Sequence, residues 1–199
     1  MDLIILAGLP ATGKTTLAKA LSQALSLPVL EKDEIKEALF DTLGYADGEA
    51  RQRLGLAANR ILLRCAESLL STGNSLILVN NFDTESVPQV EEMMARVGCR
   101  HVTIFLTGDP ELLHRRYVER DRKGLRHPAH ALCRRYPPCP EDGPPPEMTE
   151  DFFRRHFVDA GMGNFRLNGP RIEVNVTAQK ADTAALVREI QRLLAGKTS

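Results

Sequence analysis

The sequence lacks the features that mark several specialised classes of protein. It has no surplus of either charge, because 26 Lys and Arg residues balance 26 Asp and Glu residues. This balance argues against a dedicated nucleic-acid coat protein but not against a local basic groove. No apolar run approaches the length of a membrane-spanning helix, and the first residues carry no basic segment of the kind that opens a secretory signal peptide. We therefore expect a cytoplasmic protein with no membrane partner.

Cysteine is also scarce. The four cysteines, Cys65, Cys99, Cys133 and Cys139, are too few and too irregularly spaced for a disulfide scaffold, which indicates a reduced, intracellular protein. A chain of 199 residues buries roughly 70% of its unfolded surface and needs no such cross-links to fold. With 43% hydrophobic and 26% charged residues, residues 1–199 are predicted to form one domain.

Short apolar runs alternate with amphipathic stretches along the chain. The predicted strands are the runs at residues 3–7, 28–30, 75–79, 102–106 and 171–176. Helical spacing predicts helices between them. The longest is 50–71, where the apolar face is Leu54, Ala58, Ile61, Cys65 and Leu69. Such alternation is typical of an α/β fold in which helices wrap a parallel sheet.

Six of the twelve prolines lie in residues 136–148, which read YPPCPEDGPPPEM. A proline density of this kind excludes regular helix and central strand. Because a strand and a helix that the sheet needs follow this segment, we interpret it as a loop inserted in the domain rather than as a linker.

Residues 8–15 fit the pattern G-x-x-x-x-G-K-[ST], between the first predicted strand and the first predicted helix. The two glycines let the backbone curl so that successive N–H groups point at phosphate oxygens. Lys14 reaches the β- and γ-phosphates, and the Thr15 hydroxyl ligates Mg²⁺. The predicted nucleotide-binding residues of this loop are Gly8, Leu9, Pro10, Ala11, Thr12, Gly13, Lys14, Thr15 and Thr16. A plain glycine-rich turn is the alternative, but the flanking strand and helix favour nucleotide binding.

Such a loop does not by itself separate a kinase from a nucleotide-dependent switch. Switch proteins carry a Mg²⁺-holding Asp at the end of a neighbouring strand, whereas Asn80, Asn81 and Phe82 follow the predicted strand 75–79. Asp33 instead comes just after the second predicted strand, at the open end of the sheet where ligands bind in such folds. Its carboxylate could accept the proton of an attacking hydroxyl. It could also cap the helix that begins there, and the two roles are compatible.

Residues 112–135, hereafter the basic segment, contain eight Lys or Arg residues and only two acids. Arg116 and Arg120 are four residues apart and share a helix face, and Arg126 follows them. Guanidinium groups suit the negative charge that spreads over a phosphoryl group during transfer. A lid of this kind would also exclude water from the reaction. We interpret the segment as an Arg-rich lid, with a solvated basic helix as the alternative.

Together, residues 8–16, Asp33, the basic segment and the RHPAH stretch at 126–130 resemble the small P-loop kinases. This group includes chloramphenicol phosphotransferase, gluconate and shikimate kinases, zeta-type toxins and the kinase module of polynucleotide kinases. The resemblance extends over nearly the whole chain, from the first predicted strand to the last.

The resemblance implies a P-loop NTPase fold with a five-stranded parallel sheet, and ATP and Mg²⁺ as cofactors. It implies that Asp33 is the base, that Arg116 faces the adenine, and that Arg120 or Arg126 faces a phosphate. The chain departs from the group at Asn80–Asn81, where relatives often have an acid.

Two further groups of residues have both a functional and a structural interpretation. The first group is His127, His130, Cys133 and Cys139. A zinc site is possible there, but the irregular spacing favours ordinary lid residues. In the second group, Phe153 and Phe157 are four residues apart and are expected to pack as one helix stripe rather than to stack on nucleic-acid bases.

We predict an ATP-dependent kinase that transfers the γ-phosphate to a hydroxyl of a small-molecule acceptor. The predicted catalytic residues are Lys14, Asp33, Arg120 and Arg126. The acceptor pocket is expected between residues 33–43, 50–71 and 80–82, and the predicted substrate contacts are Asp33, Lys36 and Asn81. For Lys36, one helical turn after Asp33, a solvated helix face is the alternative. The alternative functions are a 5′-hydroxyl polynucleotide or nucleoside kinase and a nucleotide-binding switch without phosphotransfer.

Overall fold

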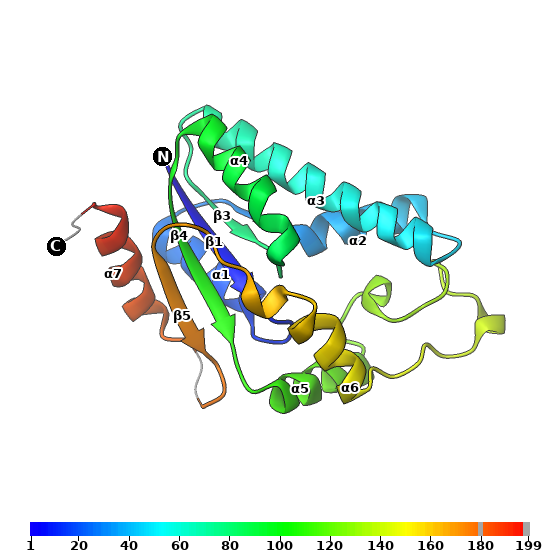
Figure 1. Cartoon of the computed structure of the whole chain (residues 1–199). Helices are drawn as coiled ribbons and strands as arrows, with labels where there is room; N and C mark the ends of the chain where they lie inside the picture. Colours follow the sequence, from blue (N-terminus) through cyan, green and yellow to red (C-terminus); the bar gives the residue numbers. More distant parts are fainter. Residues whose placement is uncertain (179–180, 197–199) are drawn as a thin grey trace.

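The computed structural model describes residues 1–178 and 181–196. Its centre is a five-stranded sheet in the order β2-β3-β1-β4-β5, in which every neighbouring pair is parallel (Figure 1). The strands are β1 (Asp2–Gly8), β2 (Val29–Glu31), β3 (Leu76–Val79), β4 (Arg100–Thr107) and β5 (Arg171–Asn175). The predicted α/β fold and its five-stranded parallel sheet are confirmed.

The central strand, β1, shows why these runs are apolar throughout. Ile4 and Leu6 point into one core cluster, whereas Leu3, Ile5 and Ala7 point into the other. The alternation follows from the two-residue period of a strand. Because helices cover both faces of the sheet, both sets of side chains must be apolar.

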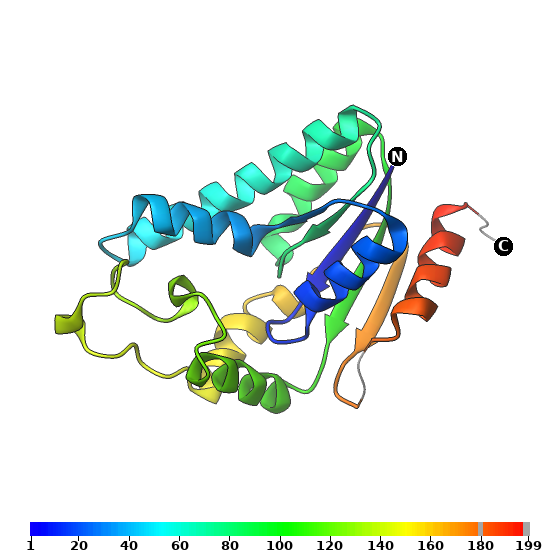
Figure 2. The ribbon, with the colours of Figure 1, turned by 180° about the vertical axis from the view of Figure 1, so that it is seen from behind.

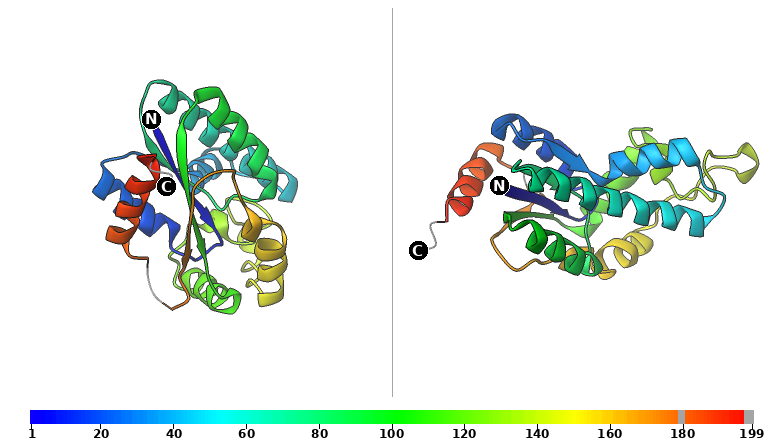
Figure 3. Two further views of the ribbon diagram at one scale, coloured as in Figure 1. Left: turned by 60° about the vertical axis from the view of Figure 1, so that its left-hand side comes forward. Right: turned by 90° about the horizontal axis from the view of Figure 1, so that it is seen from above.

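Helices cover both faces of the sheet (Figures 1 and 2). One core cluster joins the sheet to α1 (Lys14–Leu25) and α7 (Thr183–Leu194), and the other joins it to α3 (Gly48–Ser71) and α4 (Val87–Val97). α2 (Lys32–Leu43) packs against α3. Figure 3 shows α2 and the beginning of α3 reaching past the carboxyl ends of the strands. Across the described ranges, none of the helices is both long and apolar enough to span a membrane.

The long helix α3 buries a different stripe from the predicted one. Its buried residues are Ala58, Leu62, Ala66 and Leu70. Ile61 is 39% exposed and Cys65 is exposed, so the prediction of a buried Cys65 is wrong. Both stripes are apolar and adjacent, so the sequence pattern alone does not choose between them. The small alanines let α3 approach its neighbours closely, which favours the observed stripe.

After β4, the chain forms α5 (Pro110–Arg122) and later α6 (Glu150–Phe153), which continues into a π-helical turn at Arg154–Asp159. Phe153 and Phe157 are buried there, and their ring centres lie 5.6 and 5.8 Å from that of Tyr117 on α5. The prediction that these phenylalanines pack is confirmed.

The proline-rich residues 136–148 form a loop with a short 3₁₀ turn at Pro140–Asp142. An isolated bridge between Tyr45 and Tyr136 attaches its start to the turn between α2 and α3. Three aromatic rings pack together at this bridge, those of Phe40, Tyr45 and Tyr136. The loop is therefore anchored to the end of the molecule at which α2 and α3 meet.

Candidate active site

Residues 9–13 turn the chain sharply from the end of β1 into α1. Gly8 and Gly13 both have positive φ angles, 127° and 89°, which glycine adopts without steric cost. A Cβ on Gly8 would lie 1.9 Å from the carbonyl oxygen of Leu106, whereas one on Gly13 would meet nothing within 4 Å. Gly8 is therefore needed for both the turn and the close approach of β4, and Gly13 for the turn alone.

Hydrogen bonds fix the turn against the ends of β3 and β4. The Thr12 hydroxyl donates to the Leu9 carbonyl at 2.8 Å, and the Leu9 amide donates to the Leu106 carbonyl at 3.2 Å. The Gly8 amide donates to the carbonyl of Asn81, also at 3.2 Å. The predicted substrate residue Asn81 thus supports the loop through its backbone.

Lys14 is the buried cation of this loop. Its Nζ donates to the carbonyl oxygens of Gly8 at 3.0 Å and Leu9 at 2.8 Å. Burial lowers the pKa of Lys14 to about 8, and the carboxylates of Asp33 and Glu31 oppose that shift. An ammonium group has three N–H donors. Two carbonyls therefore leave Lys14 one further donor for an anion.

The start of α1 fits the phosphate tail of a nucleotide. The N-cap is Gly13, which makes no side-chain cap to the first N–H groups of the helix. These N–H groups and the positive end of the helix dipole attract an anion. Lys14, the first residue of the helix, adds a full positive charge at the same place.

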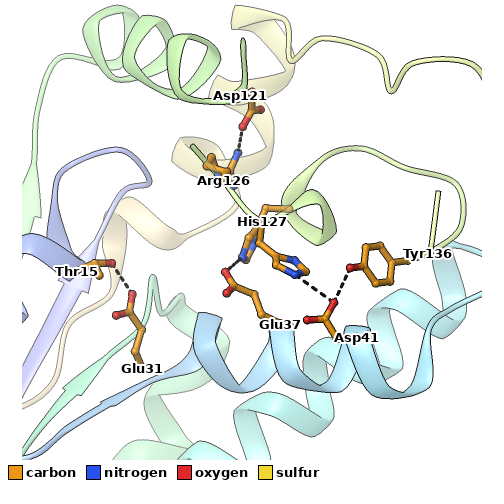
Figure 4. A network of polar contacts seen from close by, with 9 residues as sticks. Thr15, Glu31, Glu37, Asp41, Asp121, Arg126, His127 and Tyr136 are labelled. Carbon is orange, nitrogen blue, oxygen red and sulfur yellow. Dashed lines mark hydrogen bonds and ion pairs between the residues drawn. The ribbon is translucent and has the colours of Figure 1, made fainter. Parts of the chain in front are cut away.

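Glu31, the last residue of β2, faces Thr15 on α1. The Thr15 hydroxyl donates a 2.5 Å hydrogen bond to Oε1 of Glu31 (Figure 4). Burial raises the pKa of Glu31, and the bond from Thr15 opposes the rise. A hydroxyl and a carboxylate are oxygen ligands of the kind that Mg²⁺ prefers, so this pair fits the ion. Sequence reasoning missed Glu31, although an acid directly after the predicted strand 28–30 was an available signal.

Asp33 lies in the first turn of α2 but does not cap it. The helix begins at Lys32 with Glu31 as its N-cap, because β2 runs one residue further than predicted. The capping interpretation of Asp33 is therefore wrong. Burial lowers the pKa values of Lys14, Lys32 and Lys36, and the charge of Asp33 opposes the shift at all three. The exposed Asp33 carboxylate thus lies within electrostatic range of the loop cation and of the cations on its own helix.

Asn80 follows the last residue of β3, at the position where the chain departs from the group that it resembles. It is buried, and its Nδ2 donates to Oδ1 of Asn59 on α3 at 3.2 Å. Its own Oδ1 accepts the Asn81 amide at 2.8 Å. Asn80 therefore ties the end of β3 to α3.

Two of the predicted arginines lie along α5. Arg116 is half-buried, and its Nη1 donates to the carbonyl of Val176 at 3.3 Å. Arg120 is exposed, and its charge adds to the effect of burial in lowering the pKa of Lys14. Arg120 is thus within electrostatic range of the phosphate loop.

Arg126 lies beyond the end of α5. It pairs with Asp121 at 2.8 Å (Figure 4). Its guanidinium carbon lies 4.0 Å from the centre of the Tyr117 ring. Its charge also acts on Lys36, whose pKa is lowered first by burial. The charge of Arg126 is therefore within electrostatic range of α2.

The chain after Arg126 is held against α2 by polar contacts (Figure 4). Nε2 of His130 lies 2.7 Å from Oε1 of Glu37. Asp41 accepts a 2.5 Å hydrogen bond from the Tyr136 hydroxyl, which raises the pKa of Tyr136 to about 12. Asp41 also lies 3.2 Å from Nε2 of His127. Sequence reasoning missed both acids, because no local pattern connects them to histidines about ninety residues later in the chain.

The cysteines of this region do not join the histidines in a metal centre. Among the residues that the structure describes, no three His, Cys, Asp or Glu side chains are grouped so that they could hold a metal ion. His127 and His130 contact carboxylates of α2 instead.

A family model described as an AAA domain matches residues 3–134, more than half of the chain. The chain belongs to the AAA-domain family. No match to this AAA-domain chain was found among curated proteins.

Solved structures with the same fold include several kinases. A protein from Chloroflexus aurantiacus j-10-fl, provisionally described as a kinase, is 31% identical with a TM-score of 0.79, over 97% of this chain and 98% of that one. A gluconokinase from Sinorhizobium meliloti 1021 is 16% identical with a TM-score of 0.54, over 98% and 91%. The APS kinase of Mycobacterium tuberculosis is 20% identical with a TM-score of 0.55, over 98% of both chains. This AAA-domain chain is therefore one of the small P-loop kinases, as the resemblance implied.

Proposed function

We propose that the protein is an ATP-dependent kinase that transfers the γ-phosphate to a hydroxyl group of a small molecule. The observation that carries the proposal is the phosphate loop with its buried Lys14, whose Nζ donates to the carbonyl oxygens of Gly8 and Leu9. Glu31, which accepts a hydrogen bond from Thr15 of α1, precedes the first turn of α2. The exposed carboxylate of Asp33 in that turn supports the proposal as the proton acceptor that phosphoryl transfer to a hydroxyl requires.

In the proposed complex, residues 8–16 hold the phosphates and Arg116 faces the adenine. Thr15 and Glu31 hold Mg²⁺, which when bound neutralises charge on the phosphate oxygens. The loop backbone and the start of α1 fix the phosphates in position, so that the γ-phosphate meets the acceptor in a reactive orientation.

On the acceptor side, Asp33 takes the proton of the hydroxyl as its oxygen forms a bond to the γ-phosphorus. The bond from that phosphorus to the bridging oxygen breaks, and ADP leaves with the electron pair. Arg120 and Arg126 stabilise the charge on the moving group, while Lys36 and Asn81 contact the acceptor. The products are ADP and a phosphate ester.

The proposal is tested by transfer of label from ATP labelled in its γ-phosphate to a panel of sugars, sugar acids, nucleosides, antibiotics and 5′-hydroxyl oligonucleotides. With the acceptor that is labelled, Asp33→Asn should lower kcat at least about 100-fold while the Kd for ATP stays within about twofold. Glu34→Gln removes the neighbouring exposed carboxylate of the same helical turn and is the matched control, with near wild-type turnover expected.

Each other result would exclude part of the proposal. Turnover of Asp33→Asn within a few-fold of wild type would exclude Asp33 as the base. Label on the oligonucleotides alone would favour a polynucleotide kinase. Tight ATP binding with slow hydrolysis and no labelled acceptor would favour a nucleotide-dependent switch.

A further inference from the structure

The chain makes a strained turn directly after β3, at the same end of the sheet as the phosphate loop. Among the residues that the structure describes, three other than glycine have a positive φ: Ala11 at 60°, Ser26 at 55° and Phe82 at 47°. Ala11 lies within the phosphate loop, and Ser26 caps the end of α1. A positive φ is strained for a bulky residue, so other contacts must hold Phe82 in this conformation.

The aromatic ring of Phe82 supplies the first of these contacts. Phe82 is 2% exposed, and its ring stacks on that of Phe165, with 4.9 Å between the ring centres and 18° between the planes. Phe165 is fully buried, and its carbonyl oxygen accepts a 2.8 Å hydrogen bond from Nη1 of Arg171 on β5. Both rings belong to the core cluster that joins the sheet to α3 and α4. Moving the ring of Phe82 out of this cluster would leave a cavity, so the core holds it in place.

Backbone hydrogen bonds to β1 supply the remaining contacts. The Asn80 amide donates to the Leu6 carbonyl, and the Asn81 carbonyl accepts from the Gly8 amide, both at 3.2 Å. The Asn81 amide donates to Oδ1 of Asn80 at 2.8 Å. The main chain before Phe82 is therefore fixed to alternate residues of β1.

The φ angle of Phe82 sets the direction of the Asn81 carbonyl. This carbonyl belongs to the planar peptide unit between the two residues, and φ is the rotation of that unit about the N–Cα bond of Phe82. Because the core holds the ring, a φ in the ordinary negative range would turn the carbonyl away from the Gly8 amide. The positive φ therefore joins a ring held in the core to a carbonyl that points at the phosphate loop.

Gly8 carries this constraint into the nucleotide side of the site. Its amide donates to Asn81, and its own carbonyl accepts from Nζ of Lys14 at 3.0 Å. The peptide units before and after Gly8 are thus held by the turn after β3 and by the loop cation. A loop whose backbone is already ordered binds phosphates without a further loss of conformational entropy.

We propose that Phe82 is a positioning residue for the phosphate loop: its buried ring and strained backbone hold the Asn81 carbonyl against the Gly8 amide. Because Phe82 is buried, it acts through Asn81 and not by contact with the nucleotide. This proposal rests on the proposed binding of ATP to residues 8–16.

The first experiment separates the backbone of Phe82 from its ring by comparing Phe82→Gly with Phe82→Ala. Both variants lose the ring, but glycine adopts a positive φ without steric cost, whereas alanine is strained there and relaxes. Calorimetric titration with Mg²⁺ and a non-hydrolysable ATP analogue should give Phe82→Ala a Kd at least about 10-fold above that of the wild type. Phe82→Gly should bind at least about threefold more tightly than Phe82→Ala. At an ordinary buried position glycine does no better than alanine, because it leaves a larger cavity and a more flexible chain.

Two further variants separate positioning from a general loss of packing. Leu70→Ala removes a fully buried side chain of the same core cluster at the end of α3 that precedes β3, and its Kd should stay within about twofold of wild type. Phe165→Leu removes the stacking partner and should raise Kd about three- to tenfold, which also decides the matter if the substitutions at Phe82 prevent folding. Equal Kd values in Phe82→Gly and Phe82→Ala, a loss in Leu70→Ala as large as in Phe82→Ala, or wild-type binding by Phe165→Leu would overturn the proposal.

A second experiment does not require ATP. Hydrogen exchange followed by NMR compares the Gly8 amide, which donates to Asn81, with the Ile5 amide in the middle of the same strand. The ratio of the two rates reports local opening, because global unfolding exposes both amides alike. Phe82→Ala should raise the ratio at least about tenfold and Phe165→Leu by a smaller factor, while Leu70→Ala leaves it unchanged. If the wild type does not bind the ATP analogue, the proposed kinase function fails, but a raised ratio still supports the role of Phe82 in holding the loop. The same ratio in all four proteins overturns that role.

Discussion

The nucleotide side and the acceptor side of the proposed site are built in different ways. The nucleotide side is one continuous segment, residues 8–16, to which Glu31 adds a carboxylate from the neighbouring strand. The acceptor side joins α2 and α3 to residues 126–136. The hydrogen bonds that join them connect residues whose positions in the sequence differ by 80, 93 and 95. A site that is made by the backbone of one segment can be recognised from a local sequence motif. A site that is made by side chains from three elements can be recognised only from the tertiary structure. The second kind can change its ligand without disturbing the first.

The largest effect that we expect comes from the backbone of the nucleotide side. Gly8→Ala places a Cβ about where the Leu106 carbonyl oxygen lies, 1.9 Å away, at a φ of 127°. Overlap with backbone and strain at this φ together should cost at least about 3 kcal/mol in the free energy of unfolding. Denaturant unfolding followed by circular dichroism measures the loss.

Gly13→Ala is the matched variant within the same loop. Its φ is 89° but a Cβ there meets no atom within 4 Å, so strain alone should cost about 1–2 kcal/mol. If the two variants lose the same free energy of unfolding, the close approach of β4 to Gly8 adds nothing to the cost of Gly8→Ala.

A smaller effect, on the binding of Mg²⁺, is expected when the carboxylate of Glu31 is removed. Glu31 lies outside the loop of residues 8–16. In the wild type the Thr15 hydroxyl lies 2.5 Å from Oε1 of Glu31. Glu31→Gln keeps an oxygen that can accept this hydrogen bond but removes the negative charge. The Mg²⁺ concentration that half-saturates ATP binding should rise about 10- to 100-fold. ATP binding in EDTA should not weaken. Calorimetric titrations with and without Mg²⁺ separate the two effects.

Glu34 is an exposed acid in the first turn of α2, and Glu34→Gln should leave the Mg²⁺ requirement as it is in the wild type. If Glu31→Gln shows the same Mg²⁺ dependence as Glu34→Gln, the carboxylate at the end of β2 has no part in holding the ion. The contacts to the phosphates and to Mg²⁺ would then be complete within residues 8–16.

The same contrast explains which predictions from sequence succeeded. The strand positions were predicted to within two residues, because strands buried on both faces are continuous apolar runs. Cys65 was predicted to be buried because two neighbouring stripes of α3 are both apolar, and only packing selects the one with Ala66. Arg51 has no local signal at all. Its contact is with the carbonyl oxygen of Ala131, 80 residues later in the chain.

The smallest effect that we expect is on the pH dependence of the free energy of unfolding, through His130 on the acceptor side. Burial lowers the pKa of His130 below its ordinary value of 6.5, as do the charges of Lys36 and Arg126, while Asp33 and Glu37 oppose the shift. The unfolded chain therefore takes up a proton at this position at a higher pH than the folded chain does. The free energy of unfolding should fall as pH drops through about 6.5 and below, and this contribution is fully present only above that pH.

His130→Gln removes the titrating group and should flatten the fall in Tm between about pH 7 and pH 5. His101 and His156, whose pKa values burial also lowers, keep their contributions in the variant, so the change in slope reports His130 alone. A slope as steep as in the wild type would show that the folded chain protonates His130 as readily as the unfolded chain does. In that case Glu37, 2.7 Å away, compensates fully for burial, and the contact between the chain after α5 and α2 would persist through mild acid. The acceptor side would then be no more sensitive to pH than the phosphate loop.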